Sequence, residues 1–168
     1  AELDRSKILN ILLGVFSEES LHGKRESQLQ QLDKNFSGSL PLSILVAEDN
    51  VISQKLAVAI FDGLGYRIDI AVNGLQAVNR VKEKRYDLVF MDVQMPEMDG
   101  LEATTAIRVQ ERQTGRHLPI IALTASAMRG DAEVCLAAGM DDYISKPIKI
   151  EALYAALTRI LQQKENRE

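Results

Sequence analysis

Residues 42–92 divide into blocks of alternating character: LSILVAE at 42–48, VISQKLAVAIFDGLG at 51–65, RIDIAV at 67–72, GLQAVNRVKEKR at 74–85 and YDLVFMD at 86–92. The first, third and fifth blocks are short apolar runs typical of strands, and the other two have the spacing of amphipathic helices. This stretch therefore predicts the order strand, helix, strand, helix, strand.

The alternation continues toward the C-terminus. Helices are predicted at GLEATTAIRVQERQTG (100–115), DAEVCLAAG (131–139) and EALYAALTRILQQK (151–164), and strands at LPIIALTA (118–125) and DDYIS (141–145). Gly65, Gly115 and Gly139 stand where helices are expected to end, which supports these boundaries. Five strand–helix units result.

Three of the predicted strands are apolar throughout rather than alternating. These runs are Ile44–Ala47, Leu88–Met91 and Ile120–Leu123. Continuous apolar runs are typical of parallel strands that helices bury on both faces, and right-handed crossovers place helices on both sides of such a sheet. The sequence predicts an α/β fold with an open, doubly wound parallel sheet.

Polar residues gather where the predicted strands end. The strand ends carry Glu48-Asp49-Asn50, Asp92, Thr124-Ala125-Ser126 and Lys146-Pro147. Ligands of open parallel sheets bind beyond the carboxyl ends of the strands, so these groups should share one rim. We expect three carboxylates, a hydroxyl and an amine to converge there.

This combination favours metal-assisted phosphorylation of a carboxylate. Neighbouring carboxylates repel one another unless a cation neutralises them, and hard oxygen ligands suit Mg²⁺. Lys146 supplies a point charge for a phosphoryl oxygen, and Thr124, which we take to be the nearest uncommitted hydroxyl, supplies a hydrogen bond. Asp92 is the predicted nucleophile.

Four motifs carry a resemblance to a known family. AEDN at 47–50, MDVQMPEMDGLEA at 91–103, ALTASA at 122–127 and YISKPI at 143–148 occur in order and at compatible spacing. Over about Leu42 to Leu161 the sequence resembles the receiver domains of response regulators and hybrid histidine kinases. The resemblance implies a flavodoxin-like sheet of five strands in the order 2-1-3-4-5 with five flanking helices.

The resemblance also implies a role for each site residue. Mg²⁺ (or Mn²⁺) would be bound by Asp49, Asp92 and the backbone carbonyl of Gln94, with Glu48 acting through water. Asp92 would be the phosphoacceptor, Lys146 the phosphoryl-binding lysine, Thr124 the switch hydroxyl and Tyr143 the switch aromatic. Gln94 and Ser126 would tune the lifetime of the phosphoryl group, and the Lys146–Pro147 bond would be cis.

Each of these residues also has a purely structural interpretation. Asp49-Asn50 suits a helix cap, Asp92 a turn, Thr124 and above all Ser126 the cap of the next helix, Lys146 the solvated surface and Tyr143 the core. Four strand ends would have to supply matching chemistry by chance, which favours the functional interpretation. Asp92-Val93-Gln94 is also similar to the opening of haloacid-dehalogenase phosphatases, but Gln94 lacks their second carboxylate.

Composition narrows the function classes. The 168 residues carry a formal charge of −4 with no basic stripe, which disfavours direct nucleic-acid binding. Cys135 cannot form an internal disulfide and is expected to be a packed helical residue, and the simplest compartment is the cytoplasm. The apolar run Ile8–Phe16 is far shorter than the ~20 residues of a membrane span, so we expect no span in this chain.

The chain is expected to divide into an N-terminal helical segment and linker at 1–41, a receiver domain at 42–163 and a polar tail at 164–168. Three roles are open to the apolar run Ile8–Phe16: packing on the receiver, pairing with a second copy of the chain, or forming the edge of a preceding domain. We rank self-association slightly ahead. The expected partners are a histidine kinase, a histidine phosphotransfer domain, or both. The favoured origin is the C-terminal receiver of a hybrid sensor histidine kinase, which would place the chain in the cytoplasm, as part of a membrane-bound sensor if the parent kinase is one. The alternative is a free-standing response regulator that acts by phosphorylation-dependent partner binding. The receiver itself would catalyse its own phosphotransfer and autodephosphorylation.

Overall fold

The strands in the described part of the chain form one parallel sheet. The structure is a computed structural model that describes residues 36–126 and 128–165. The strands are β1 (Ile44–Ala47), β2 (Ile68–Ala71), β3 (Leu88–Asp92), β4 (Ile120–Thr124) and β5 (Asp142–Ser145), in the spatial order β2-β1-β3-β4-β5. All four pairings are parallel. The predicted fold class and strand order are confirmed.

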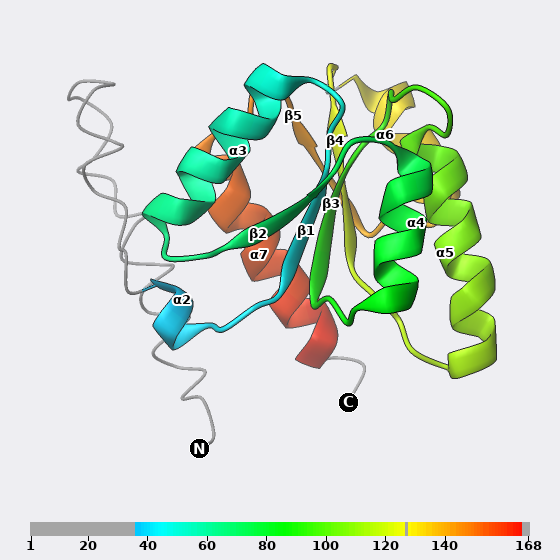
Figure 1. Cartoon of the computed structure of the whole chain (residues 1–168), viewed down its shortest axis with the longest axis horizontal. Coiled ribbons are helices and arrows are strands. Elements are labelled where there is room, and N and C mark those ends of the chain that lie inside the picture. The colour runs from blue at the N-terminus through cyan, green and yellow to red at the C-terminus, as the bar shows by residue number, and fades with distance from the viewer. Residues whose placement is uncertain (1–35, 127, 166–168) are drawn as a thin grey trace.

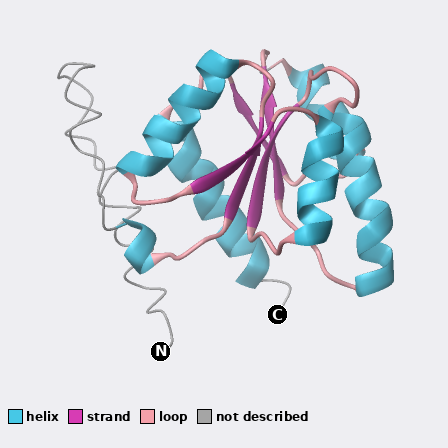
Figure 2. Cartoon of the chain, in the orientation of Figure 1, coloured by secondary structure: helices cyan, strands magenta, loops and turns pink. Residues whose placement is uncertain are grey.

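Helices cover both faces of the sheet (Figures 1 and 2). They are α2 (Phe36–Ser39), α3 (Val51–Gly63), α4 (Gly74–Glu83), α5 (Gly100–Thr114), α6 (Arg129–Ala137) and α7 (Ile150–Glu165). One apolar core lies between the sheet and α3 and α7, and a second lies between the sheet and α4, α5 and α6. These two layers require β1, β3 and β4 to be buried along their whole length, as they are.

Local signals in the sequence set the starts and ends of the helices. The Asn50 side chain caps α3, and Asp99 and Glu102 form a reciprocal capping box at the start of α5. Helix α5 ends at Gly115, whose φ of 68° lies in the left-handed region that glycine adopts without a steric penalty. These caps place the loops that follow β1 and β3 at the carboxyl edge of the sheet.

Helix α6 differs from the prediction in its start. It begins at Arg129, and its N-cap is Met128, which makes no side-chain capping bond. The expectation that Ser126 caps this helix is wrong. Ser126 lies two residues too early, and its hydroxyl instead accepts a hydrogen bond from the Met128 amide at 3.2 Å within the loop.

The chain before β1 also contacts the domain. Leu40 is buried in the core on the α3 and α7 side, and the Tyr66 hydroxyl donates to its carbonyl. The Ser37 amide donates to the carbonyl of Leu64 at the end of α3. The predicted self-association through Ile8–Phe16 concerns residues outside those described. Among the described residues, no helix has the length and apolar character needed to cross a membrane.

Candidate functional site

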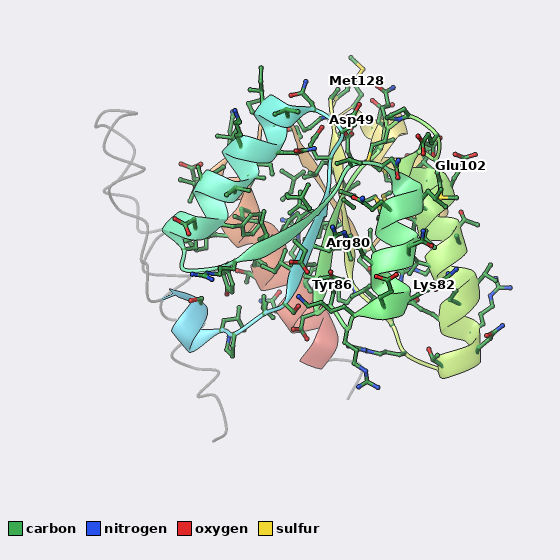
Figure 3. The ribbon with its side chains drawn as sticks, viewed as in Figure 1. Asp49, Arg80, Lys82, Tyr86, Glu102 and Met128 are labelled. Carbon is green, nitrogen blue, oxygen red and sulfur yellow. The ribbon has the colours of Figure 1, made fainter. Side chains whose placement is uncertain are left out.

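The carboxylates predicted at the strand ends do come together. Glu48 and Asp49 directly follow β1, and Asp92 is the last residue of β3. One carboxylate oxygen of each residue lies within 4.8 Å of the others. Glu48 is 1% and Asp92 2% exposed, whereas Asp49 is exposed at the rim, near the end of β1 in Figure 3. Two buried carboxylates and one open to solvent form a group that could hold a cation.

Lys146 reaches this group from the loop after β5. Its Nζ donates to Asp92 Oδ2 at 2.8 Å and to Glu48 Oε2 at 3.3 Å. The Lys146–Pro147 bond is cis, as predicted, and the Lys146 amide donates to the carbonyl of Thr124 at 2.7 Å. The side chain of Lys146 is 26% exposed, so its interpretation as a solvated surface lysine is wrong.

Burial and neighbouring charges shift the pKa values of Glu48 and Lys146. Burial raises the pKa of Glu48, and the negative charge of Asp92 raises it further, while the Asn50 amide and Lys146 oppose the shift. Burial on its own lowers the pKa of Lys146, but hydrogen bonds and charge from Asp92 and Glu48 outweigh it, and the pKa is raised overall. Lys146 is therefore a firmly charged ammonium between two carboxylates.

Backbone amides orient both buried carboxylates. The Asn50 amide donates to Glu48 Oε1 at 3.1 Å, and the Gln94 amide donates to Asp92 Oδ1 at 3.1 Å. Asn50 also caps α3 through its own side chain, so the capping interpretation holds for Asn50, and the bond from the Gln94 amide two residues later fits the turn interpretation of Asp92. These structural roles support the site rather than replace it. The amide contact to Glu48 was not predicted, although AEDN contains both of its residues.

Thr124 lies beside the carboxylates but its hydroxyl is already bonded. Oγ1 donates to the Ser126 carbonyl at 2.7 Å and accepts from the Ser126 amide at 3.2 Å. The expectation of an uncommitted hydroxyl is wrong, because the loop after β4 turns back onto the strand end. A cavity of ≈ 170 Å³ joins Asp92, Thr124 and Lys146 to Cys135 of α6, which is buried as predicted.

Tyr143 of β5 is half-buried and packs against the core on the α4, α5 and α6 side. Tyr143 therefore packs against the core without being buried in it, and the core interpretation holds only in part. Its partial exposure also leaves it at the surface formed by α6 and β5.

A flavodoxin-like sheet with an acidic group, a buried aspartate and a lysine at its carboxyl edge defines the receiver class of signalling domains. The sequence profile of the response regulator receiver domain matches residues 44–158. The chain belongs to this family, whose members accept phosphoryl groups in two-component phosphorelays.

Individual relatives agree with this assignment. Hybrid signal transduction histidine kinase I of Dictyostelium discoideum is 47% identical over 128 residues, which cover 72% of this chain and 7% of the relative. The receiver domain of the sensor histidine kinase PA1611 from Pseudomonas aeruginosa PAO1, with a magnesium ion coordinated in its active-site cleft, is 48% identical with a TM-score of 0.61 and covers 73% of this chain and 95% of that one.

A second similar structure contains a partner. It is the complex of the Saccharomyces cerevisiae histidine phosphotransfer protein Ypd1 with the receiver domain of Ssk1, matched at 37% identity and a TM-score of 0.65 over 70% of this chain and 86% of that one. The first three curated relatives are much longer proteins, of which this chain spans 7%, 17% and 4%.

Proposed function

We propose that Asp92 accepts a phosphoryl group from a phosphohistidine, with Lys146 and Thr124 as its partners in the reaction. The observation that carries this proposal is the placement of Asp92, which is 2% exposed yet lines a cavity and holds one oxygen 2.8 Å from the Lys146 ammonium. A buried carboxylate needs such a counter-charge, and an ammonium beside a nucleophilic oxygen also suits an incoming phosphoryl oxygen.

Magnesium fits the residues around Asp92. Asp49, Asp92 and the Gln94 carbonyl would hold the ion directly, with Glu48 acting through water. The group offers oxygen ligands alone, one of them at the open rim, and this matches the preference of Mg²⁺ for oxygen and retained water. When bound, the ion would neutralise charge on the phosphoryl oxygens. Mn²⁺ has the same ligand preference and would substitute for it.

The transfer itself is a displacement at phosphorus. An Asp92 carboxylate oxygen forms the new O–P bond while the N–P bond of the phosphoimidazole breaks, and the imidazole nitrogen keeps the electron pair. Lys146 would move from its carboxylate contacts to a phosphoryl oxygen. Water later attacks the same phosphorus, and neither Gln94 nor Ser126 offers a carboxylate to activate it. We therefore propose a phosphoryl lifetime that is neither very short nor unlimited.

The donor would approach the carboxyl edge of the sheet. Exposed apolar side chains stand there on the first turns of α3 and before α6: Val51, Ile52, Leu56 and Met128, which are 59%, 78%, 40% and 74% exposed. An apolar surface beside the nucleophile suits a protein donor, either a histidine kinase or a histidine phosphotransfer domain. The receiver and phosphotransfer protein in the yeast complex support this choice of partner.

We further propose that the chain is the C-terminal receiver of a hybrid sensor histidine kinase. The hybrid kinases of Dictyostelium support this origin, because each matches the chain over only a small part of its own length. A cytoplasmic location follows from this proposal. An open reading frame that continues upstream into a kinase domain would support it, and a start codon there would favour a free-standing regulator.

The test of the site uses acetyl phosphate and Mg²⁺ as the only other components. We expect phosphate incorporation into the wild type and into Asp62→Asn, which changes an exposed aspartate of α3. Asp92→Asn should incorporate none, because an amide is not a nucleophile. Asp49→Ala should lose both Mg²⁺ binding and phosphorylation. Wild-type labelling of Asp92→Asn would refute the assignment.

A further inference from the structure

We infer that Asn73, in the loop before α4, is a positioning residue for the metal site. Its side chain bonds to Glu97 and thereby holds the β3–α5 loop, residues 93–99, in the shape that presents the Gln94 carbonyl. This inference rests on the proposed function, because the Gln94 carbonyl is a proposed metal ligand.

The β3–α5 loop contains a strained residue. Glu97 has a φ of 67° and is the one non-glycine residue with positive φ among those described. The Met98 amide donates to the Pro96 carbonyl at 2.8 Å, so Glu97 forms the centre of a tight three-residue turn. A side chain in this region of backbone space persists where surrounding contacts hold it.

Asn73 supplies one of those contacts. Its Nδ2 donates to Glu97 Oε2 at 3.0 Å, and its Oδ1 accepts from the Gln76 amide at 2.8 Å. One end of the amide caps α4 and the other end bridges to the neighbouring loop. A serine in this place could perform the first task but is too short for the second.

The two loops also meet backbone to backbone. The Gly74 amide donates to the Met98 carbonyl at 2.9 Å, and a Cβ on Gly74 would lie 2.4 Å from that oxygen. The β2–α4 loop is therefore a firm support for the turn, and the starts of α4 and α5 lie next to each other at this edge (Figure 1).

The hydrogen bond between Asn73 and Glu97 restrains the middle of the β3–α5 loop, which the hydrogen bonds at the base of the loop do not reach. The Gly100 amide donates to the Val93 carbonyl at 3.0 Å and closes the base of the loop, and the Gln94 amide is bonded to Asp92. The middle of the loop is held by the contacts of Asn73 and Gly74. Because Gln94 lies between these two sets of bonds, loss of the bridge should loosen its carbonyl.

The test measures Mg²⁺ affinity by NMR titration with the metal alone. Asn73→Ser keeps the helix cap and removes the bridge. Glu97→Ala keeps a Cβ at the strained position and removes the Cγ methylene and the carboxylate, while Glu97→Gln keeps an acceptor of the same length. We expect the first two to weaken Mg²⁺ binding about two- to tenfold, the range of one net hydrogen bond, and Glu97→Gln to stay within about twofold of wild type.

A merely structural role would lower the melting temperature without this pattern. Asn73→Ser combined with Glu97→Ala should lose no more affinity than either single change, because both remove the same bond. Wild-type affinity in both single variants, or losses that add in the double variant, would overturn the inference. Asp49→Ala separates the two proposals: wild-type Mg²⁺ binding in that variant would mean that the metal site itself is wrong.

Discussion

Replacing Lys146 with methionine removes the only ammonium within reach of two buried carboxylates, among the described residues. Its Nζ lies 2.8 Å from Asp92 and 3.3 Å from Glu48, whose side chains are 3% and 2% exposed. Breaking a fully buried pair costs about 3–5 kcal/mol because the remaining charge is left without a partner. Lys146 is partly open to solvent, and Glu48 can take up a proton, so we expect a loss of about 2–3 kcal/mol in the free energy of unfolding.

Lys84→Met is the matched control. Lys84 pairs with Asp69 at the same 2.8 Å, but the two side chains are 56% and 34% exposed. An exposed pair contributes about 1 kcal/mol or less. If burial sets the strength of an ion pair, Lys146→Met will lose more free energy of unfolding than Lys84→Met, although both pairs have the same 2.8 Å distance.

Urea unfolding with and without Mg²⁺ measures the stability lost in each lysine variant and how much of it Mg²⁺ restores. Mg²⁺ should bind Lys146→Met more tightly than wild type, because the competing ammonium is gone, and saturating Mg²⁺ should recover much of the lost stability. Phosphorylation by acetyl phosphate should nevertheless fall. Equal losses in the two lysine variants, or a loss in Lys146→Met that Mg²⁺ leaves unchanged, would refute this account of the site.

Three further outcomes follow from the structure. Thr124→Ala should still be phosphorylated but lose most of the NMR shift changes over α6 and β5 that a phosphoryl mimic causes in wild type. Ile52→Asp should slow phosphotransfer from a phosphotransfer protein but not from acetyl phosphate, whereas Val109→Asp, on the 52%-exposed position of α5, should affect neither. Asp69→Asn should reduce the loss of unfolding free energy that wild type shows at acid pH. The bond from Lys84 lowers the pKa of Asp69, so the stability that Asp69 contributes is present above pH 3.8 and is lost as pH falls through the lower folded pKa. This contribution is at most about 1 kcal/mol.

The sheet could be predicted because burial on both faces leaves a direct mark on composition. The runs that became β1, β3 and β4 are apolar at nearly every position, and no other common element has that pattern at that length. The apolar pattern does not determine the spatial order of the strands, and the predicted order is implied by the family resemblance. The strand-end groups could be placed together because parallel strands end at one edge.

The contacts within the loops could not be predicted in the same way. The bridge between Asn73 and Glu97 joins residues 24 positions apart. It also depends on a left-handed φ at Glu97, a residue type that does not indicate such a conformation in the sequence. Ser126 is interpreted as a helix cap from its residue type, although the pattern places the start of the helix at Asp131 and the structure begins it at Arg129. Side-chain rotation and loop closure are decided by contacts, and periodicity carries no information about them.

The bonded state of Thr124 changes how a switch at this site has to operate. Its hydroxyl donates to the Ser126 carbonyl at 2.7 Å, so a phosphoryl group on Asp92 must offer a stronger acceptor than a neutral carbonyl. It does so by adding about −1.5 to −2 charges and new acceptor oxygens. We propose that when Thr124 turns to it, the Ser126 carbonyl loses its donor, and Tyr143 on the neighbouring strand β5 rotates toward the space that Thr124 leaves. The Thr124 hydroxyl can donate to the Ser126 carbonyl or to a phosphoryl oxygen, and a position between the two gives a poor hydrogen bond to either. The proposed exchange therefore has two end states, and phosphorylation favours the second because its hydrogen bond is the stronger one.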